Sequence, residues 1–227
     1  MNLLALIPAR GASKRIPRKN IKLLNGKPLI GWTIDEALNT SSIKRVVVST
    51  DDEEIASIAK TLGADVPFMR PNKIAEDGSP GIDTALHAIE QLSEFDWLIL
   101  LQPTSPLRTA ADIDGIVRFC LEQNSPSAVS ISQVHKNPNW MYQYTESKKL
   151  QPIIFNRMNT SCQQDLTKTY VLNGALYLAR IDWLKEQKSF VGQETLGYVM
   201  SPESSVDIDT QIDWQWAEFL IERSHAK

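Results

Sequence analysis

Short apolar runs alternate with amphipathic segments along most of the chain. The Leu-rich run at 3–7 and the Val-rich run at 45–49 predict strands, and residues 28–38 and 52–62 after them predict helices. Further strands are expected at 65–68, 97–101, 128–131 and 170–179, with another helix at 110–123. This rhythm is typical of βαβ units, so we expect an α/β three-layer sandwich with a mainly parallel sheet.

Local signals set the expected helix starts. Pro28 suits the first position of one helix, and Ser79 is expected to cap another that has Pro80 at its first position. The last helix is predicted to start at the capping-box-like segment 210–213. Its spacing predicts that four apolar side chains face the core, namely Ile212, Trp216, Phe219 and Leu220.

The alternating pattern stops between residues 133 and 168. This stretch is polar with scattered aromatic residues and has no clear period. Exposed aromatic side chains would suit a subunit interface, whereas packing under a long loop is an equally good interpretation. We expect residues 1–227 to form a single domain, with 133–168 as an inserted arm.

The charge distribution is uneven. The chain has 24 basic and 27 acidic side chains and a net charge of -3, which argues against nucleic acid as a partner. However, residues 1–34 hold seven basic side chains and no acidic one. The N-terminal end is therefore predicted to bind something anionic.

Cysteine content and hydropathy indicate the compartment. The two cysteines lack metal or redox spacing and are too few for a disulfide framework. The apolar run at 3–7 is too short for a signal peptide, and no apolar stretch approaches the ~20 residues that span a bilayer. We expect a cytoplasmic protein that does not contact a membrane.

The basic loop at residues 8–20 follows the first strand, where parallel α/β sheets place ligands. Gly11 permits close backbone approach, and Arg, Lys and Ser side chains supply donors suited to phosphate oxygens. The loop matches neither of the standard glycine-rich phosphate motifs. A solvated cationic loop is the alternative interpretation, but the local charge density favours anion binding.

The motifs of this chain resemble those of a known enzyme family. The loop reads Ile-Pro-Ala-Arg-Gly-Ala-Ser-Lys-Arg-Ile-Pro-Arg-Lys-Asn and closely resembles the signature of the N-acylneuraminate (nonulosonic acid) cytidylyltransferases. Further matches occur in order along essentially the whole chain: Ser49-Thr-Asp-Asp52, Arg70-Pro71, Asp77, Leu101-Gln-Pro-Thr-Ser-Pro-Leu-Arg108, Asn173-Gly-Ala-Leu-Tyr177 and Val206-Asp-Ile-Asp-Thr210. The resemblance implies a Rossmann-like nucleotidyltransferase fold and a homodimer, with 133–168 as the dimerisation arm.

The reaction implied by the resemblance joins CTP to a nine-carbon 2-keto sugar acid and releases pyrophosphate. Such a transfer depends on positioning and on neutralising phosphate charge. Arg10, Lys14 and Lys19 are the candidates for that clamp, with Ser13 and Asn20 as polar contacts to phosphate or ribose.

Asp207 and Asp209 are the candidate Mg²⁺ ligands. Two residues apart in an extended segment, their side chains project from one side of the backbone. The sequence around them offers no basic partner, which favours a metal over an ion pair, and Asp209 is also counted among the catalytic residues. Helix capping is the alternative role, which we assign to Asp213 instead.

The remaining predicted contacts rest on position and resemblance. The loop after the strand at 97–101 is expected to present Gln102, Thr104 and Ser105 to the sugar acid. Arg70 is a candidate for the cytidine end, and Asn173 is expected to face the sugar.

The sequence departs from the sialic-acid members at two positions. Gln163 and Val171 stand where those members commonly carry arginines that can receive the sugar carboxylate. Either another cation such as Arg157 or Lys168 substitutes, or the acceptor is a related nonulosonate such as legionaminate.

Two alternative functions remain open at this level. One is a cytidylyltransferase for another sugar acid, such as 3-deoxy-manno-octulosonate. The other is a non-catalytic nucleotide or RNA binder that uses the cationic loop and has no need of the two aspartates.

Overall fold

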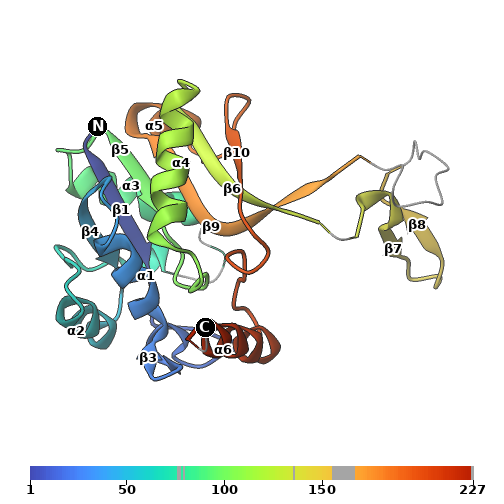
Figure 1. Cartoon of the computed structure of the whole chain (residues 1–227), viewed down its shortest axis with the longest axis horizontal. Coiled ribbons are helices and arrows are strands. Elements are labelled where there is room, and N and C mark those ends of the chain that lie inside the picture. Colours follow the sequence, from blue (N-terminus) through green and yellow to red (C-terminus); the bar gives the residue numbers. More distant parts are fainter. Residues whose placement is uncertain (76–77, 79, 135, 155–166, 226–227) are drawn as a thin grey trace.

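The computed structural model describes residues 1–75, 78, 80–134, 136–154 and 167–225. At its centre is a six-stranded sheet with the order β10-β6-β9-β5-β1-β4 (Figure 1). β1 pairs in parallel with β4 and β5, β10 pairs in parallel with β6, and β9 runs antiparallel to both its neighbours. The strands span β1 Leu3–Pro8, β4 Ile43–Ser49, β5 Trp97–Leu100, β6 Ser127–Gln133, β9 Tyr170–Arg180 and β10 Leu196–Val199.

Helices cover both faces of this sheet, so the predicted three-layer α/β sandwich is confirmed. α1 (Leu29–Leu38), α2 (Glu53–Thr61) and α4 (Ala110–Glu122) pack on one face, whereas α3 (Gly81–Gln91) and α5 (Ile181–Gln187) pack on the other. Alternate residues of β1 enter the two cores, since Ala5 packs with the first set and Leu6 with the second. Strands buried on both faces explain the continuous apolar runs.

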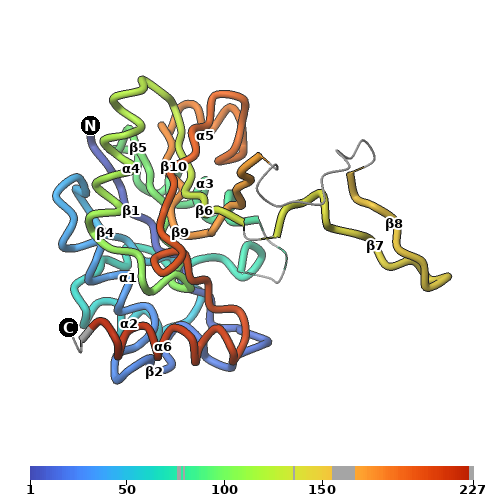
Figure 2. The backbone as a smooth tube through the Cα atoms, turned by 45° about the vertical axis from the view of Figure 1, so that its right-hand side comes forward, coloured from blue at the N-terminus to red at the C-terminus, as the bar shows by residue number. Residues whose placement is uncertain are grey.

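The last helix, α6 (Gln211–His225), lies below the sheet beside the short strands β2 (Leu23–Leu24) and β3 (Lys27–Pro28) (Figure 2). The prediction of its buried face was wrong for three of four residues, because Ile212, Trp216 and Phe219 are exposed. The side chains that enter the core are Trp214, Ala217 and Ile221, with Leu220 packed against them. Both faces of α6 carry apolar residues, so spacing alone could not choose between them.

Three local predictions need correction. Residues 65–68 form no strand: Asp65 makes an isolated parallel bridge to Val47, and the chain then turns away. Pro28 and Pro80 occupy the cap positions before α1 and α3 rather than the first helical positions. The expected cap Ser79 lies outside the described residues. The strand β10 and the helix α5 were not predicted.

An arm projects from the body where the paired ends of β6 and β9 extend beyond the core (Figures 1 and 2). It contains the single-turn helix Pro138–Trp140 and an antiparallel pair, β7 (Tyr142–Tyr144) with β8 (Leu150–Pro152). Many of its apolar side chains are exposed, namely Trp140, Met141, Tyr142, Tyr144, Leu150 and Ile153. Residues 155–166 lie outside the described structure.

None of the helices in the described residues is both long enough and apolar enough to span a bilayer.

Candidate active site

A cleft of about 550 Å³ opens at the carboxyl edge of the parallel strands. The segments that follow β1, β4 and β5 meet there, because parallel strands end at the same edge of a sheet. The lining residues include most of the predicted site: Arg10, Ser13, Lys14, Lys19, Asn20, Arg70, Gln102, Thr104 and Asp209. Ser105, Asn173 and Asp207 are not among them.

The basic loop forms one wall of the cleft and is held by backbone contacts. The Ala9 amide donates to the Ser49 carbonyl oxygen at 2.9 Å, and buried Asn20 donates from Nδ2 to the Arg10 carbonyl oxygen at 2.9 Å. A Cβ at Gly11 would lie 2.6 Å from Oδ2 of Asp52, so only glycine fits this close approach. The loop is therefore fixed to the end of β4.

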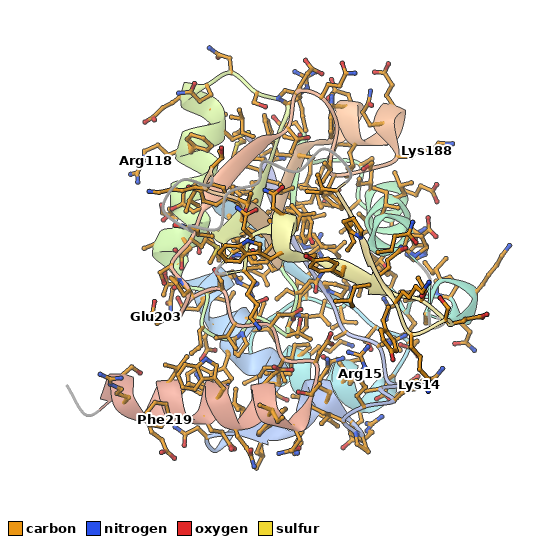
Figure 3. The ribbon with its side chains drawn as sticks, turned by 90° about the vertical axis from the view of Figure 1, so that its right-hand side faces the viewer. Lys14, Arg15, Arg118, Lys188, Glu203 and Phe219 are labelled. Atoms are coloured by element: carbon orange, nitrogen blue, oxygen red, sulfur yellow. The ribbon has the colours of Figure 1, made fainter. Side chains whose placement is uncertain are left out.

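Asn20 lines the cleft, as predicted, and its predicted contact with phosphate or ribose stays a prediction. Its amide nitrogen already holds the loop backbone next to Arg10, so it shapes the wall. The basic side chains Lys14 and Arg15 lie together on this loop (Figure 3). The two others that line the cleft, Arg10 and Lys19, complete a cationic surface suited to phosphate oxygens.

Arg70 also lines the cleft and is almost fully buried. Its Nη1 donates to Oγ1 of Thr84 at 3.2 Å, and its Nη2 lies 3.4 Å from Oδ1 of Asp51. Burial lowers the pKa of the Arg70 guanidinium, the Asp51 carboxylate opposes this, and the positive charge of Arg10 lowers the pKa further. Two guanidinium groups therefore face a common space, where an anion would relieve their repulsion.

The loop after β5 forms the floor. Gln102 and Thr104 line the cleft, and Oγ1 of Thr104 donates to Oε1 of Gln102 at 3.4 Å. The carbonyl oxygen of Thr104 accepts a 2.8 Å hydrogen bond from the Ile208 amide, which joins this loop to the C-terminal aspartates. Ser105 is fully buried and lies outside the cleft, contrary to the expectation that it faces a substrate.

Arg108 was not predicted to act in the site, yet it holds this floor. Its guanidinium is buried and donates to the carbonyl oxygens of Gln102 (3.2 Å) and Ala175 (2.7 Å) and to Oγ1 of Thr33 (2.6 Å). Burial lowers its pKa to about 9, so it stays charged at neutral pH. The sequence signal was an arginine beside an apolar strand and a proline-rich loop, but its partners lie far away along the chain.

Asp209 reaches the cleft from the C-terminal side. Asp209 has no basic partner nearby in the sequence, but it has two in the fold: Arg15 Nη1 lies 2.9 Å from Oδ2 of Asp209 and Lys19 Nζ lies 3.5 Å from its Oδ1. These partners come from the basic loop, which the local sequence could not reveal. Both Arg15 and Asp209 are more than half exposed, so their ion pair stabilises the fold little.

Asp207 lies behind Asp209 on the same segment. Loss of hydration around its carboxylate raises its pKa, a hydrogen bond from Thr104 opposes this, and the charge of Asp209 raises it further. Its Oδ2 would be 3.9 Å from a Cβ placed on Gly174, where Gln102 Oε1 is also near. The two carboxylates and this amide oxygen are the hard oxygen donors that Mg²⁺ prefers.

These donors fit a divalent cation whose remaining ligands are phosphate oxygens of a substrate. In the described ranges, no group of three or more His, Cys, Asp or Glu side chains could hold a metal by itself. Mg²⁺ commonly binds through one or two carboxylates together with substrate phosphates and water, so an aspartate pair opposite a cationic loop meets that requirement.

Asn173 does not face the cleft, contrary to the expectation from the motif. Its buried side chain donates from Nδ2 to Oγ of Ser205 at 2.8 Å and accepts at Oδ1 from the Ala175 amide at 3.2 Å and from Oγ of Ser130. It therefore ties β9 to the segment before Asp207. The next residue, Gly174, has a φ of +78°, a left-handed conformation that favours glycine.

Of the positions that the resemblance links to acceptor choice, Val171 is exposed on β9 and pairs with Ser132 of β6. Lys168 is also exposed. Gln163, Arg157 and Asp77 lie outside the described residues.

The family assignment follows from comparison with known proteins. A family model described as Cytidylyltransferase matches residues 4–181. A CMP-N,N'-diacetyllegionaminic acid synthase of Legionella pneumophila is 38% identical over 98% of this chain and 97% of its own length. The pseudaminic acid cytidylyltransferase of Campylobacter jejuni is 32% identical over 99% of this chain and 98% of its own.

Other similarities agree with this assignment. An N-acylneuraminate cytidylyltransferase of Escherichia coli is 31% identical over 95% of this chain, which spans 51% of that longer protein. The solved structure of CMP:2-keto-3-deoxy-manno-octonic acid synthetase complexed with CTP superposes with a TM-score of 0.75, covering 99% of this chain and 100% of that one. At 18% identity this likeness shows the fold alone. Together with the site geometry and the matched motifs, these findings show that the chain belongs to the cytidylyltransferase family.

Proposed function

We propose that this enzyme transfers CMP from CTP to the anomeric hydroxyl of a nonulosonic acid and releases pyrophosphate. The observation that carries the proposal is the cleft of about 550 Å³ itself, which is lined by the basic loop at 8–20 and by Asp209, with Asp207 beside it on the same segment. The names of the relatives from L. pneumophila and C. jejuni support the acceptor class.

The chemistry divides between the two sides of the cleft. The hydroxyl oxygen of the sugar acid forms a bond to the α-phosphorus of CTP, and the bond to the pyrophosphate oxygen breaks. Arg10, Lys14 and Lys19 neutralise the charge that develops on the departing pyrophosphate, and Ser13 donates to a phosphate oxygen. Arg70 binds at the cytidine end of the cleft.

Asp207 and Asp209 would hold Mg²⁺ against the phosphates of CTP. When bound, the cation would offset phosphate charge and lower the pKa of a nearby hydroxyl. The raised pKa of Asp207 in the metal-free protein is consistent with a carboxylate that needs a cation close to it.

The acceptor is proposed to be legionaminate or a close relative rather than N-acetylneuraminate. Val171 cannot give a carboxylate the two parallel hydrogen bonds of an arginine. The relative from L. pneumophila, named for diacetyllegionaminic acid, is 38% identical across nearly the whole chain. Gln102 and Thr104 on the floor of the cleft are the proposed contacts to the acceptor.

The test is a comparison of kcat/KM for the purified protein with CTP, Mg²⁺ and a panel of acids. We expect N,N'-diacetyllegionaminate to be the best substrate among it, N-acetylneuraminate, pseudaminate and 3-deoxy-manno-octulosonate. Preference for N-acetylneuraminate would contradict the acceptor assignment. Salt-sensitive RNA binding without turnover of any acid would favour the non-catalytic alternative.

Assembly and location complete the proposal. The exposed apolar side chains of β7 and β8 support a homodimer formed through the arm, since such surface is rarely left in contact with water. The cysteine content supports the cytoplasm as the site of action.

A further inference from the structure

Asp51 touches two walls of the cleft without lining it. Its Oδ1 accepts a 3.1 Å hydrogen bond from the Gly11 amide of the basic loop. The same oxygen lies 3.4 Å from Nη2 of Arg70, which lines the cleft. One carboxylate oxygen therefore joins groups that are 59 positions apart in the sequence and that the proposed function assigns to the phosphate and cytidine ends of CTP.

The backbone near Asp51 already fixes the main chain of both walls. The Ala9 amide donates to the Ser49 carbonyl oxygen at 2.9 Å, and the Arg70 amide donates to the Thr50 carbonyl oxygen at 2.7 Å. What these bonds leave undetermined is the orientation of the Arg70 side chain. Thr84 and Asp51 both hold that side chain, and Asp51 is the charged partner; the Arg70 side chain is only 5% exposed and that of Asp51 19%, so water screens their ion pair little.

The neighbouring Asp52 does different work. Its Oδ1 accepts from the Glu54 and Ile55 amides at 3.0 Å, which caps α2, and its carboxylate pairs with Arg18. Asp52 therefore serves the helix and the far end of the basic loop. Of the two acidic residues in the 49–52 motif, Asp51 is therefore the one that contacts both the Gly11 amide and Arg70.

The charges make this contact matter. Arg70 is buried near the positive charge of Arg10, and its other hydrogen-bond partner, Thr84, is neutral. Removing the carboxylate from a buried ion pair is strongly unfavourable, because it leaves the guanidinium charge uncompensated. Without Asp51, we expect Arg70 to turn away from Arg10, which would change the distance between the two ends of the nucleotide site.

We propose that Asp51 is a positioning residue that couples the basic loop to Arg70 and thereby sets the span of the CTP site. This inference rests on the proposed use of CTP but not on the identity of the acceptor. It assigns a role to the Ser49–Asp52 motif, which the proposed function leaves without one.

The test uses Asp51→Asn in the full chain and the dissociation constant for CTP, measured by calorimetry. Asparagine keeps an oxygen acceptor for the Gly11 amide but removes the charge that holds Arg70. We expect CTP to bind roughly tenfold more weakly, the effect of losing one charge-assisted contact. Asp65→Asn is the matched control. Asp65 pairs with Arg45 of β4, away from the cleft, so this variant should leave CTP binding unchanged.

A double-mutant cycle with Arg70→Gln separates positioning from general destabilisation. If Asp51 acts through Arg70, adding Asp51→Asn to the Arg70→Gln variant should change CTP affinity by less than twofold. A change of that size is roughly the scatter within which the effects of independent sites add. Multiplicative losses in the double variant would overturn the proposal, as would unchanged CTP affinity in folded Asp51→Asn.

Asp51→Glu is the second variant, for use if Asp51→Asn does not fold. It keeps the charge but moves it by one methylene, so we expect weaker CTP binding than in the parent, and parent-like affinity would overturn the inference. Failure of the parent protein to bind CTP would contradict the proposed function and this inference together. Normal CTP binding in the parent with no effect of any Asp51 variant would contradict the inference alone.

Discussion

Lys19 bridges the two ends of the chain. Its Nζ donates to the carbonyl oxygen of Ile208 at 2.7 Å and lies 3.5 Å from Oδ1 of Asp209. Residues 189 positions apart in the sequence are thus held in direct contact at the cleft. The Lys19 side chain is only 15% exposed, so its charge is poorly hydrated and acts strongly on nearby groups.

Replacing Lys19 with Met should remove its contacts with Ile208 and Asp209 and reduce the positive charge available to phosphate. Loss of a hydrogen-bonded charge of this kind is worth ~2 kcal/mol, so kcat/KM for CTP should fall roughly 30-fold. Steady-state kinetics with varied CTP checks this. Lys22→Met is the matched control: Lys22 packs over Trp214 outside the cleft, and parent-like kinetics are expected there. Equal losses in both variants would refute the specific role of Lys19.

Alanine variants of Asp209 and Asp213 should distinguish metal binding from helix capping. Oδ2 of Asp213 accepts hydrogen bonds from the Thr210 amide (2.7 Å) and from its hydroxyl (2.8 Å), as a cap does, whereas Asp209 faces the cleft. Asp209→Ala should reduce Mg²⁺-dependent turnover about 100-fold or more with little change in stability. Asp213→Ala should lose ~1 kcal/mol of stability while its Mg²⁺ titration stays near that of the parent. Retained Mg²⁺ stimulation in Asp209→Ala would remove the metal assignment.

Asp207→Asn should stabilise the metal-free protein while impairing turnover. The pKa of Asp207 in the fold is above its ordinary value of 3.8, so the folded state disfavours the carboxylate. The cost to folding stability of ionising Asp207 is absent well below pH 3.8. It grows as the pH rises from 3.8 to the raised pKa and is complete above that pKa. The melting temperature of the variant should therefore exceed that of the parent at pH 7 but match it near pH 3. A variant less stable than the parent at pH 7 would contradict this sign.

Arg108→Met should destabilise the fold and distort the floor of the cleft. Three hydrogen bonds from a buried guanidinium are lost, including the buried one to the Ala175 carbonyl oxygen, at a cost of about 3 kcal/mol or more. Urea unfolding at pH 7 measures the change. Arg118→Met, at an exposed position on α4, is the control and should stay within ~0.5 kcal/mol of the parent. A similar small change for Arg108→Met would show that its contacts contribute little.

The dimer proposal can be tested on the arm. Tyr144 and Leu150 are opposite each other on β7 and β8, and both are largely exposed, at 70% and 65%. Leu150→Asp should convert the protein to a monomer, because it places a charge in the proposed apolar interface. Light scattering after gel filtration gives the mass. Leu23→Asp, at a 58% exposed position on β2, is the matched control and should remain dimeric. A monomeric parent would refute the proposal directly.

The sequence by itself determined the layers and the ligand-binding edge of the sheet. Apolar runs such as Leu3–Ile7 are continuous because the strands are covered on both faces, so their pattern identifies buried parallel strands without any tertiary information. The basic loop was recognisable because its charges are contiguous in the chain, and the motifs identified the family for the same reason.

Only the tertiary structure decided the features that depend on contacts between distant segments. The ion pairs of Asp209 with Arg15 and Lys19, and the buried hydrogen bonds of Arg108 and Asn173, join residues that no local pattern connects. The buried face of α6 was likewise decided by packing, since Trp214 and Trp216 are equally apolar in the sequence but only Trp214 meets Leu24 and Ile208 in the core. Local periodicity tells which side chains share a face, whereas the free energy of packing against the rest of the chain selects which face is buried.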